Sequence, residues 1–280
     1  MDEVDKVEKV FGVRNPEPPY PPNPPTHLLA MPLLDPIELL RDSWNLYRAH
    51  LWSLVGYSAW MLLPVGALFL LTFAPDHWLV FVVSLLLTII QIYLALWMTI
   101  AIVRSTHRIA QKQEVNPTAI AHDALVQLLP LLKTVVLQGL IILGGLLLFI
   151  IPGLVFSFWY AFAQLATILD DKRPVEALVF SKSLVEGRFW PVVWRVVGGP
   201  ILLAAIYSLV IGFVLMLIGQ LMGIDSAALM AEDSPDWITL IESVGEVFFI
   251  PFILVYTVLL FHDLKKHPVK PVLDKSCDVA

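Results

Sequence analysis

The chain has 280 residues and a net charge of −6; 58% of its residues are hydrophobic, 15% are charged, and the mean hydropathy is +0.78. Soluble domains carry about a quarter charged residues, so the composition argues against a soluble enzyme. The negative charge, without a block rich in Lys and Arg, argues against a nucleic-acid-binding protein. One cysteine, Cys277, excludes an internal disulfide framework and a cysteine-based zinc cluster. The composition therefore indicates a chain whose surroundings are lipid.

Residues 1–34 are predicted to form a disordered, proline-rich cytoplasmic tail. Seven of the ten residues from Pro16 to Pro25 are proline, which favours an extended polyproline helix that acts as a semi-rigid spacer. The run contains overlapping P-x-x-P patterns, so a protein partner with an aromatic groove is the alternative to a merely solvated tail. The acidic start lacks the basic and apolar regions of a signal peptide.

Six apolar segments follow, and all but the short fourth are long enough for a helix to cross a bilayer core about 30 Å thick. They are predicted at Leu51–Phe73, Trp78–Val103, Leu131–Ile151, Leu154–Leu169, Val196–Gly219 and Ile238–His262. The connections at Ala74–His77, Ile151–Gly153 and Gln220–Trp237 pair them into three hairpins. We therefore predict an all-α integral membrane protein with a six-helix membrane domain over residues 35–266 and a cytoplasmic tail over 267–280.

Proline and capping patterns add detail to these spans. Ser234-Pro235-Asp236 is typical of a helix start, with a capping hydroxyl, a proline at the first helical position and an acid near the positive helix end. Prolines inside a span should kink or break it where neighbouring helices supply hydrogen-bond partners. The prolines concerned are Pro64, Pro200 and Pro251.

The distribution of basic residues predicts the orientation. Cytoplasmic loops carry an excess of Lys and Arg. Of the 18 such residues, 5 precede the first span, 4 lie from Arg104 to Lys133, 5 from Lys172 to Arg195, and 4 follow the last span. The three opposite connections hold none, and contain Asp76, Asp225, Glu232, Asp233 and Asp236 instead. Both termini are therefore predicted to be cytoplasmic, in a protein of the cell (plasma or inner) membrane.

Two segments that precede hairpins match each other. Pro36–Trp52 aligns without gaps to Pro174–Trp190, with six identical positions of 17: Pro36/Pro174, Glu38/Glu176, Leu40/Leu178, Ser43/Ser181, Leu46/Leu184 and Trp52/Trp190. In the first copy an apolar stripe is typical of a helix in the membrane interface, with its apolar side toward acyl chains. The stripe consists of Ile37, Leu40, Trp44, Tyr47 and Leu51.

A fainter third copy is expected over residues 117–129. The sequence thus predicts three repeats, about 36–103, 117–169 and 174–262, each a cytoplasmic interfacial amphipathic helix followed by a hairpin. The alternative is that amphipathic helices starting with proline look alike without being repeats. We expect the equivalent serines, Ser43 and Ser181, to hydrogen-bond the backbone one turn back or a neighbouring span.

The motifs resemble a known family. Its pattern is I-P-G, a short span ending in an acid, and then A-L-x-x-S-x-x-L-x-x-G. The matching positions are Pro152, Gly153, Ala177, Leu178, Ser181, Leu184 and Gly187. Asp170 or Asp171 stands where the family usually has glutamate, and Phe261–Lys265, which contains Asp263, is similar to its aromatic-x-Asp-Leu-basic ending. This bacterial and archaeal membrane family is named after the membrane domain attached to some glycerophosphodiester phosphodiesterases.

The resemblance covers about residues 35–266 and implies the membrane region alone. The phosphodiesterase chemistry in that family belongs to a separate barrel domain, and nothing here could encode a (β/α)₈ barrel of about 250 residues. The resemblance therefore implies a prokaryotic membrane protein without an assigned activity.

Motifs for catalysis are absent from the sequence. No G-x-S-x-G, H-E-x-x-H, P-loop or G-x-G-x-x-G pattern occurs, and we expect no catalytic residue, metal or cofactor. His122-Asp123 and His262-Asp263 are adjacent pairs whose side chains diverge by about 100° on a helix, so a structural or interfacial role is expected. The ending Cys277-Asp-Val-Ala280 mimics a prenylation box, which the neighbouring acid makes a coincidence.

Five polar residues within or near the spans are candidates for a polar path: Gln91, Gln138, Gln164, Glu242 and Glu246. The two glutamates share one helix face, and ionisable groups at membrane depth indicate a cation or proton path; the alternative is a solvated helix end. Interhelical hydrogen bonds explain the glutamines, with a polar cavity as the alternative. Small residues at intervals of four indicate close helix packing within the bundle rather than a dimer seam: Ala204, Ser208 and Gly212, and then Gly219 and Gly223.

Three function classes follow. The favoured prediction is a non-enzymatic membrane protein that organises membrane lipids or binds a protein partner through its interfacial helices and proline-rich tail. A transporter or carrier of a lipid or neutral small solute is the alternative, because repeats are common in transporters. An enzyme is disfavoured because no acid, base or metal groups share a depth. The sequence is compatible with a homo-oligomer as well as with a monomer.

Overall fold

In the computed structural model of this protein, residues 33–75, 77–223 and 237–267 are described. The chain divides into two units, Met1–Leu33 and Leu34–Ala280, and all helices below belong to the second. Over the described ranges the regular structure is helical, and six stretches are long and apolar enough to cross a membrane. They are Leu51–Leu71, Trp78–Ala110, Pro117–Leu148, Ile150–Asp170, Phe189–Leu221 and Trp237–Lys266. The chain is therefore an all-α, multi-pass membrane protein, as the apolar segments predict.

Three predictions from the sequence concern residues outside the described ranges. They are the proline-rich tail, the helix start at Ser234-Pro235-Asp236 and the C-terminal ending with Cys277.

The first hairpin consists of α3 (Leu51–Ser58), a 3₁₀ turn η2 (Ala59–Met61), α4 (Leu62–Leu71) and the long helix α5 (Trp78–Ala110). The predicted break occurs at η2, just before Pro64. A proline ring clashes with the carbonyl group four residues earlier, here that of Trp60, which accounts for the tighter turn. His77 caps α5 by accepting a hydrogen bond from the Leu79 N–H at 3.2 Å. The helix continues past the predicted end at Val103 because charged residues outside the lipid can still form helix.

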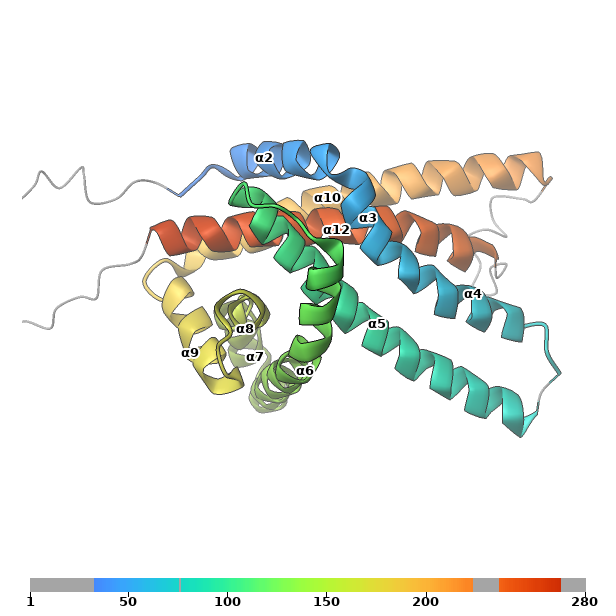
Figure 1. Ribbon diagram of the computed structural model, residues 1–280, viewed down its shortest axis with the longest axis horizontal. Coiled ribbons are helices and arrows are strands. Elements are labelled where there is room, and N and C mark those ends of the chain that lie inside the picture. The colour runs from blue at the N-terminus through green and yellow to red at the C-terminus, as the bar shows by residue number, and fades with distance from the viewer. Residues whose placement is uncertain (1–32, 76, 224–236, 268–280) are drawn as a thin grey trace, which may run out of the picture. The chain divides into compact units, whose positions relative to one another are not determined.

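The second hairpin differs from the sequence prediction at its start. Residues 117–129 do not form a separate helix but the first part of α6 (Pro117–Leu148), which Asn116 caps and which contains Pro130. Figure 1 shows α6 changing direction along its length, as an internal proline favours. The following helices are α7 (Ile150–Trp159) and α8 (Ala163–Asp170). In Figure 1, α8 is seen nearly end-on, whereas α5, α10 (Phe189–Leu221) and α12 (Trp237–Lys266) run across the view.

The turn between α6 and α7 is shorter than predicted. The extended residue Phe149 alone separates the two helices, and Pro152 and Gly153 lie in the first turn of α7 rather than in a loop. Proline fits a first turn because its missing N–H would have no partner there. Gly153 allows the close approach of the helices, since a Cβ atom at this position would lie 2.5 Å from Cγ and 2.8 Å from the backbone N of Leu146.

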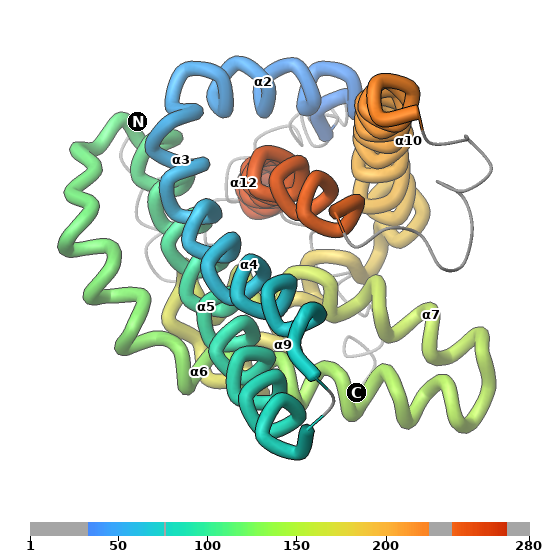
Figure 2. Tube along the Cα trace, turned by 90° about the vertical axis from the view of Figure 1, so that its right-hand side faces the viewer, coloured from blue at the N-terminus to red at the C-terminus, as the bar shows by residue number. Residues whose placement is uncertain are grey.

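In the third hairpin, α10 and α12 pack side by side (Figures 1 and 2). Pro200 and Pro251 lie inside these helices without interrupting them, so of the predicted kink or break the break does not occur. The missing N–H of Pro251 leaves the carbonyl group of Val247 without its usual helical partner. Ser58 on α3 supplies the replacement, because its Oγ donates to the Val247 carbonyl oxygen at 2.6 Å. A neighbouring hydroxyl thus lets the helix continue through its proline.

The two matching segments form α2 (Pro36–Ala49) and α9 (Pro174–Val185), and both begin at their proline. Their serines are buried, each 0% exposed. Ser43 donates to the Leu39 carbonyl oxygen at 2.6 Å, one turn back. Ser181 donates to the Trp159 carbonyl oxygen at 2.7 Å and accepts from the Phe162 N–H at 3.0 Å. Both hydrogen bonds expected for these serines are therefore confirmed.

Helix α2 lies across α12 and reaches α10, as Figure 2 shows from the side. Its buried face consists of Leu39, Ser43 and Tyr47. Of the predicted apolar stripe, only Tyr47 belongs to this face, whereas Ile37 is 73% and Trp44 47% exposed. Part of the stripe thus points away from the protein.

The predicted stripe of small residues on α10 does not pack within the bundle. Ala204, Ser208 and Gly212 are exposed, and no described atom of a neighbouring element would lie within 4 Å of a Cβ atom at Gly212. The predicted packing is therefore wrong for this stripe. The α10 face that meets α12 instead carries larger side chains, including Tyr207, whose ring stacks on Phe249 at 4.5 Å between centroids.

Candidate functional site

Charged side chains join the ends of four helices at one end of the membrane domain. Arg104 on α5 donates to Asp123 of α6 at 3.0 Å and to Asp171 at 3.3 Å, and Lys265 of α12 donates to Asp170 of α8 at 2.7 Å. We call this region the charged end. Exposed ion pairs contribute only about 0–1 kcal/mol each, but linked pairs fix the relative positions of the helix ends.

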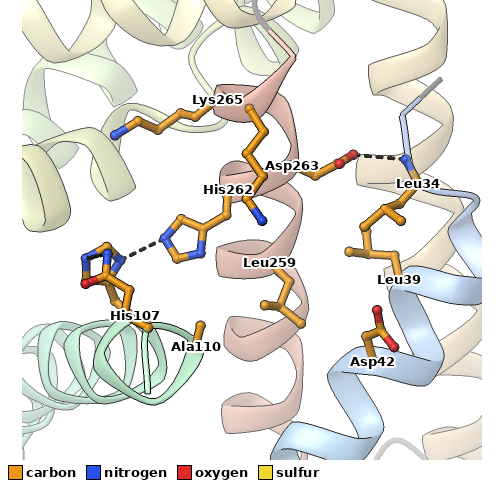
Figure 3. Close-up of a pocket in the computed structure, with 11 residues that line it drawn as sticks. Leu34, Leu39, Asp42, His107, Ala110, Leu259, His262, Asp263 and Lys265 are labelled. Carbon is orange, nitrogen blue, oxygen red and sulfur yellow. Dashed lines mark hydrogen bonds between the residues drawn. The ribbon is translucent and has the colours of Figure 1, made fainter. Parts of the chain in front are cut away.

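A cavity of about 450 Å³ opens at the charged end (Figure 3). Residues of α12, of α2 and of the end of α5 line the cavity, and α12 lies between the other two helices in the view of Figure 3. Its lining residues are Leu34, Leu39, Asp42, His107, Ala110, Gln111, Leu259, His262, Asp263, Lys265 and Lys266. Small-molecule sites typically measure about 300–1,000 Å³ and combine apolar walls with a few polar groups. The cavity has a volume in this range, and its lining is more polar than usual, with seven polar or charged residues and four apolar ones. This concentration of polar groups makes it the candidate functional site.

Two histidines from distant parts of the chain meet in this cavity. Nδ1 of His107 and Nε2 of His262 are 2.7 Å apart, as Figure 3 shows. The other ring nitrogen of His107 lies 2.9 Å from Nε2 of Gln111. A hydrogen bond between two ring nitrogens needs one that carries no proton, so at least one of the two imidazoles is neutral. The sequence analysis did not connect these residues, because 155 positions separate them.

The carboxylate of Asp263 links residues at the edge of the cavity. Its carboxylate accepts a hydrogen bond from the Leu34 N–H at 3.1 Å and pairs with His267 at 3.3 Å. Nε of Arg195 donates to the Leu34 carbonyl oxygen at 2.9 Å. The residue that precedes α2 is thereby fixed from both sides, by α12 and by α10.

Arg188, just before α10, stabilises the end of α12. Its guanidinium donates to the carbonyl oxygens of Leu264, at 2.8 Å, and His267, which would otherwise lack helical partners. Burial lowers the pKa of Arg188 below its ordinary value, and the carboxylate of Asp263 opposes this shift. Together with Asp263, Arg188 gives this end of the helix a fixed structure.

The motif positions of the resembled family serve mainly in packing. Ala177, Leu178, Ser181 and Leu184 form the buried face of α9. Gly187 follows this helix with φ +83°, a left-handed conformation that favours glycine. Of the fixed motif positions, Asp263 and Lys265, both in the aromatic-x-Asp-Leu-basic ending, line the cavity at the charged end. Most motif positions therefore stabilise the packing of the helices. The lining residues Asp42, His107 and Lys266 are not part of the motif.

The candidates for a polar path are divided between two places. Nε2 of Gln164 on α8 donates to Oε1 of Gln138 on α6 at 3.2 Å, so these two residues join neighbouring helices. Gln91 and Glu246 meet elsewhere, in a cavity of about 50 Å³ between α4, α5 and α12. Glu242 is exposed and lines neither, and its backbone carbonyl oxygen accepts from Tyr207 at 3.0 Å. The structure therefore brings four of the five residues together in two pairs and leaves Glu242 apart from both, so the five do not line one path.

An apolar groove of about 420 Å³ runs beside α2, between α10 and α12. Its walls include Trp44, Tyr47, Leu203, Ile206, Tyr207, Val210, Phe248, Phe249 and Phe252. The Tyr47 hydroxyl donates to the Phe248 carbonyl oxygen at 2.8 Å. Burial raises the pKa of Tyr47 to about 12, so the phenol stays protonated at neutral pH and keeps this hydrogen bond. The polar group of Tyr47 is thus turned to α12, while its ring faces the groove.

Within the described ranges, no three His, Cys, Asp or Glu residues form a group that could hold a metal ion. Comparisons of the chain with protein-family models, curated proteins and solved structures give no match. The fold and its six apolar helices define a multi-pass membrane protein. Kinship with the resembled membrane family remains a prediction from the motifs.

Proposed function

We propose that this protein has a non-enzymatic role in the cell membrane, in which it binds lipid and organises the membrane around α2 and α9. The observation that carries the proposal is the apolar groove beside α2. Its residues belong to an interfacial helix and two spans, so an acyl chain could enter it from the surrounding lipid. Exposed Ile37 and Trp44 extend this apolar surface along α2.

The proposed orientation places the charged end in the cytoplasm. The Lys and Arg residues of the chain all lie in the segments that lead to this end or along the helices that reach it, whereas the opposite connections have none. This distribution favours cytoplasmic termini. Lipid headgroups of the inner leaflet would then face α2, α9 and the cavity at the charged end.

A carrier is the second candidate, and one observation favours it. The cavity that contains Gln91 and Glu246 adjoins a cavity of about 250 Å³, because both are lined by Val65, Gln91 and Ser243. The larger cavity reaches Thr72 and Thr239, at the ends of α4 and α12 that lie opposite the charged end. A small neutral solute could enter there. The buried residues Val247 and Met98 line the smaller cavity and close the two joined cavities on the side toward the protein interior.

Retention of lipid by the purified protein tests the first proposal. The full chain is purified in native-lipid particles, exchanged into detergent, and its bound lipids and proteins are measured by mass spectrometry. Ile206→Trp should fill the groove and release a retained lipid, whereas Leu209→Trp, at an exposed α10 position outside the groove, should retain it. A protein that is retained in a stoichiometric amount would also support the organising role, because it would identify a binding partner.

Two results would contradict the proposal. Equal lipid retention by both tryptophan variants would remove the groove as a lipid site. A single enriched solute that is lost when Gln91, Gln138 and Gln164 are all changed to leucine would identify a carrier instead.

A further inference from the structure

We propose that the cavity at the charged end binds the headgroup of a zwitterionic phospholipid, with Lys266 facing the phosphate and Asp42 facing the ammonium group. This site is separate from the apolar groove, and the proposal rests on the lipid-binding role only in that the ligand comes from the membrane. It adds a headgroup preference, which the groove alone could not produce.

The charges of the cavity point to a ligand with both signs. Lys265 is already paired with Asp170, and Asp263 is only 4% exposed and accepts a hydrogen bond from the Leu34 N–H. Lys266 and Asp42 are exposed in the cavity lining, and neither has a hydrogen bond or ion pair with any described residue. One cation and one carboxylate thus remain for a ligand.

Ligands of a single sign fit this arrangement less well. A headgroup with only a phosphate would be attracted by Lys266 but would bring its charge near the carboxylate of Asp42, and a purely cationic ligand would meet Lys266. Like charges at close range are unfavourable. A phosphate ester that carries an ammonium group satisfies both residues at once.

The neutral part of the lining suits the same ligand. Gln111, His107 and His262 form a hydrogen-bonded chain on one side of the cavity, and Figure 3 shows Asp42 on the other side of α12 from His107. Imidazole and amide groups can donate to phosphate oxygens without adding a fixed charge. The apolar residues Leu34, Leu39, Ala110 and Leu259 offer contacts for the glycerol and the first methylene groups.

The same chemistry could come from a whole lipid or from a water-soluble headgroup. We commit to the lipid, because the cavity lies at the ends of spans α5 and α12, next to the interface, and part of its lining is apolar. Soluble glycerophosphoethanolamine, which has both charges but no acyl chains, separates the two sources.

The test compares two lipids that differ in the ammonium group. The full chain is reconstituted in nanodiscs with equal amounts of phosphatidylethanolamine and phosphatidylglycerol, and the lipids retained per protein are counted by native mass spectrometry. We expect the wild type to prefer phosphatidylethanolamine. Asp42→Asn should reduce the preference by up to about fivefold, the upper limit for one exposed ion pair, without reducing bound phosphatidylglycerol. Lys266→Gln should weaken both lipids to the same extent.

Matched variants control for general changes in surface charge. The control variants are Glu38→Gln and Lys133→Gln. Glu38 lies one turn before Asp42 on α2, Lys133 is exposed on α6, and neither residue lines the cavity. Both should behave like the wild type. The side chains of Asp42 and Lys266 have no hydrogen bonds to other described residues, and an unchanged melting temperature confirms that each variant is folded.

The outcomes separate this site from the proposed role. An unchanged lipid ratio in Asp42→Asn overturns the proposal even if the wild type retains lipid in its groove. Displacement of bound phosphatidylethanolamine by equimolar glycerophosphoethanolamine overturns the choice of a lipid as the ligand. A wild type that retains no lipid at all overturns both the site and the proposed function.

Discussion

The carboxylate of Asp263 accepts a hydrogen bond at 3.1 Å from the backbone N–H of Leu34, 229 positions earlier in the chain. This contact joins the first residue of the membrane unit to the end of its last helix. Asp263 is only 4% exposed, so its carboxylate depends on neighbouring protein groups for hydrogen-bond partners. The start of α2 therefore has a fixed position relative to α12.

Replacement of Asp263 tests the importance of this contact. Asp263→Leu removes the acceptor of this part-buried hydrogen bond, and a typical hydrogen bond contributes about 0.5–1.5 kcal/mol to stability. We expect a lower melting temperature in detergent, measured by intrinsic fluorescence. Asp263→Asn keeps an oxygen acceptor of the same shape and should lose less. If both variants lose the same stability, the hydrogen bond to Leu34 is not the reason that this residue matters.

Ser181→Leu should destabilise the contact between α9 and the turn that joins α7 to α8. The substitution removes two hydrogen bonds, to Trp159 and Phe162, and adds volume to a fully buried position, which typically costs about 1–3 kcal/mol by itself. Thermal unfolding in detergent measures the effect.

The control for this variant is Ser183→Leu, an exposed serine of the same helix. Lys182 is a poorer control than the sequence indicates, because its Nζ lies 4.6 Å from the centre of the Trp159 ring. Equal melting temperatures for the two leucine variants would show that the buried position tolerates the larger side chain.

Gly153→Ala should separate α6 from α7. The added Cβ atom would lie 2.5–2.8 Å from atoms of Leu146, one of which is a backbone nitrogen that cannot move independently. We expect a loss of about 1–3 kcal/mol from overpacking. Gly144→Ala is the matched control, because nothing lies within 4 Å of its Cβ position, and alanine has the higher helix propensity. A stable Gly153→Ala variant would contradict the close helix packing.

A double-mutant cycle tests whether Gln138 and Gln164 act as a helix–helix contact. Polar contacts between membrane helices average about 0.6 kcal/mol and reach about 1.7 kcal/mol. Because the two amides are 3.2 Å apart, the single changes to leucine should each cost stability, and the double change should cost less than their sum. Purely additive losses would mean that the two residues do not depend on each other.

The proposed orientation has a direct test with reporter fusions. A reporter that is active only outside the cytoplasm should be silent when fused after Lys266 and active when fused near Ser226, which lies outside the described ranges. A reporter active only in the cytoplasm should give the reverse pattern and serves as the control. Activity of the first reporter after Lys266 would overturn the orientation.

Sequence analysis predicts where lipid surrounds this chain better than where its helices end. The apolar segments locate all six spans, but α5 continues to Ala110 and α6 begins at Pro117. Hydropathy indicates whether a segment lies in lipid or in water, but not where its helix ends. A helix with charged residues can extend beyond the membrane without a break. Only the caps, Asn116 among them, mark the actual helix ends.

The candidate site was predicted less well than the fold. Ser43 and Ser181 could be found, because equivalent positions in two matching segments indicate a shared role. His107 and His262 could not, since they lie on different helices and their contact depends on how α5 packs against α12. No local period or spacing encodes that packing.

The one-residue turn at Phe149 also constrains how the protein enters the membrane during synthesis. A single extended residue covers about 3.3 Å, so no loop exists that could remain on one side while α6 inserts alone. We therefore expect the insertion machinery to accept α6 and α7 together, as one helical hairpin. We expect a ribosome stalled between these helices to hold a chain whose α6 is not yet committed to the bilayer.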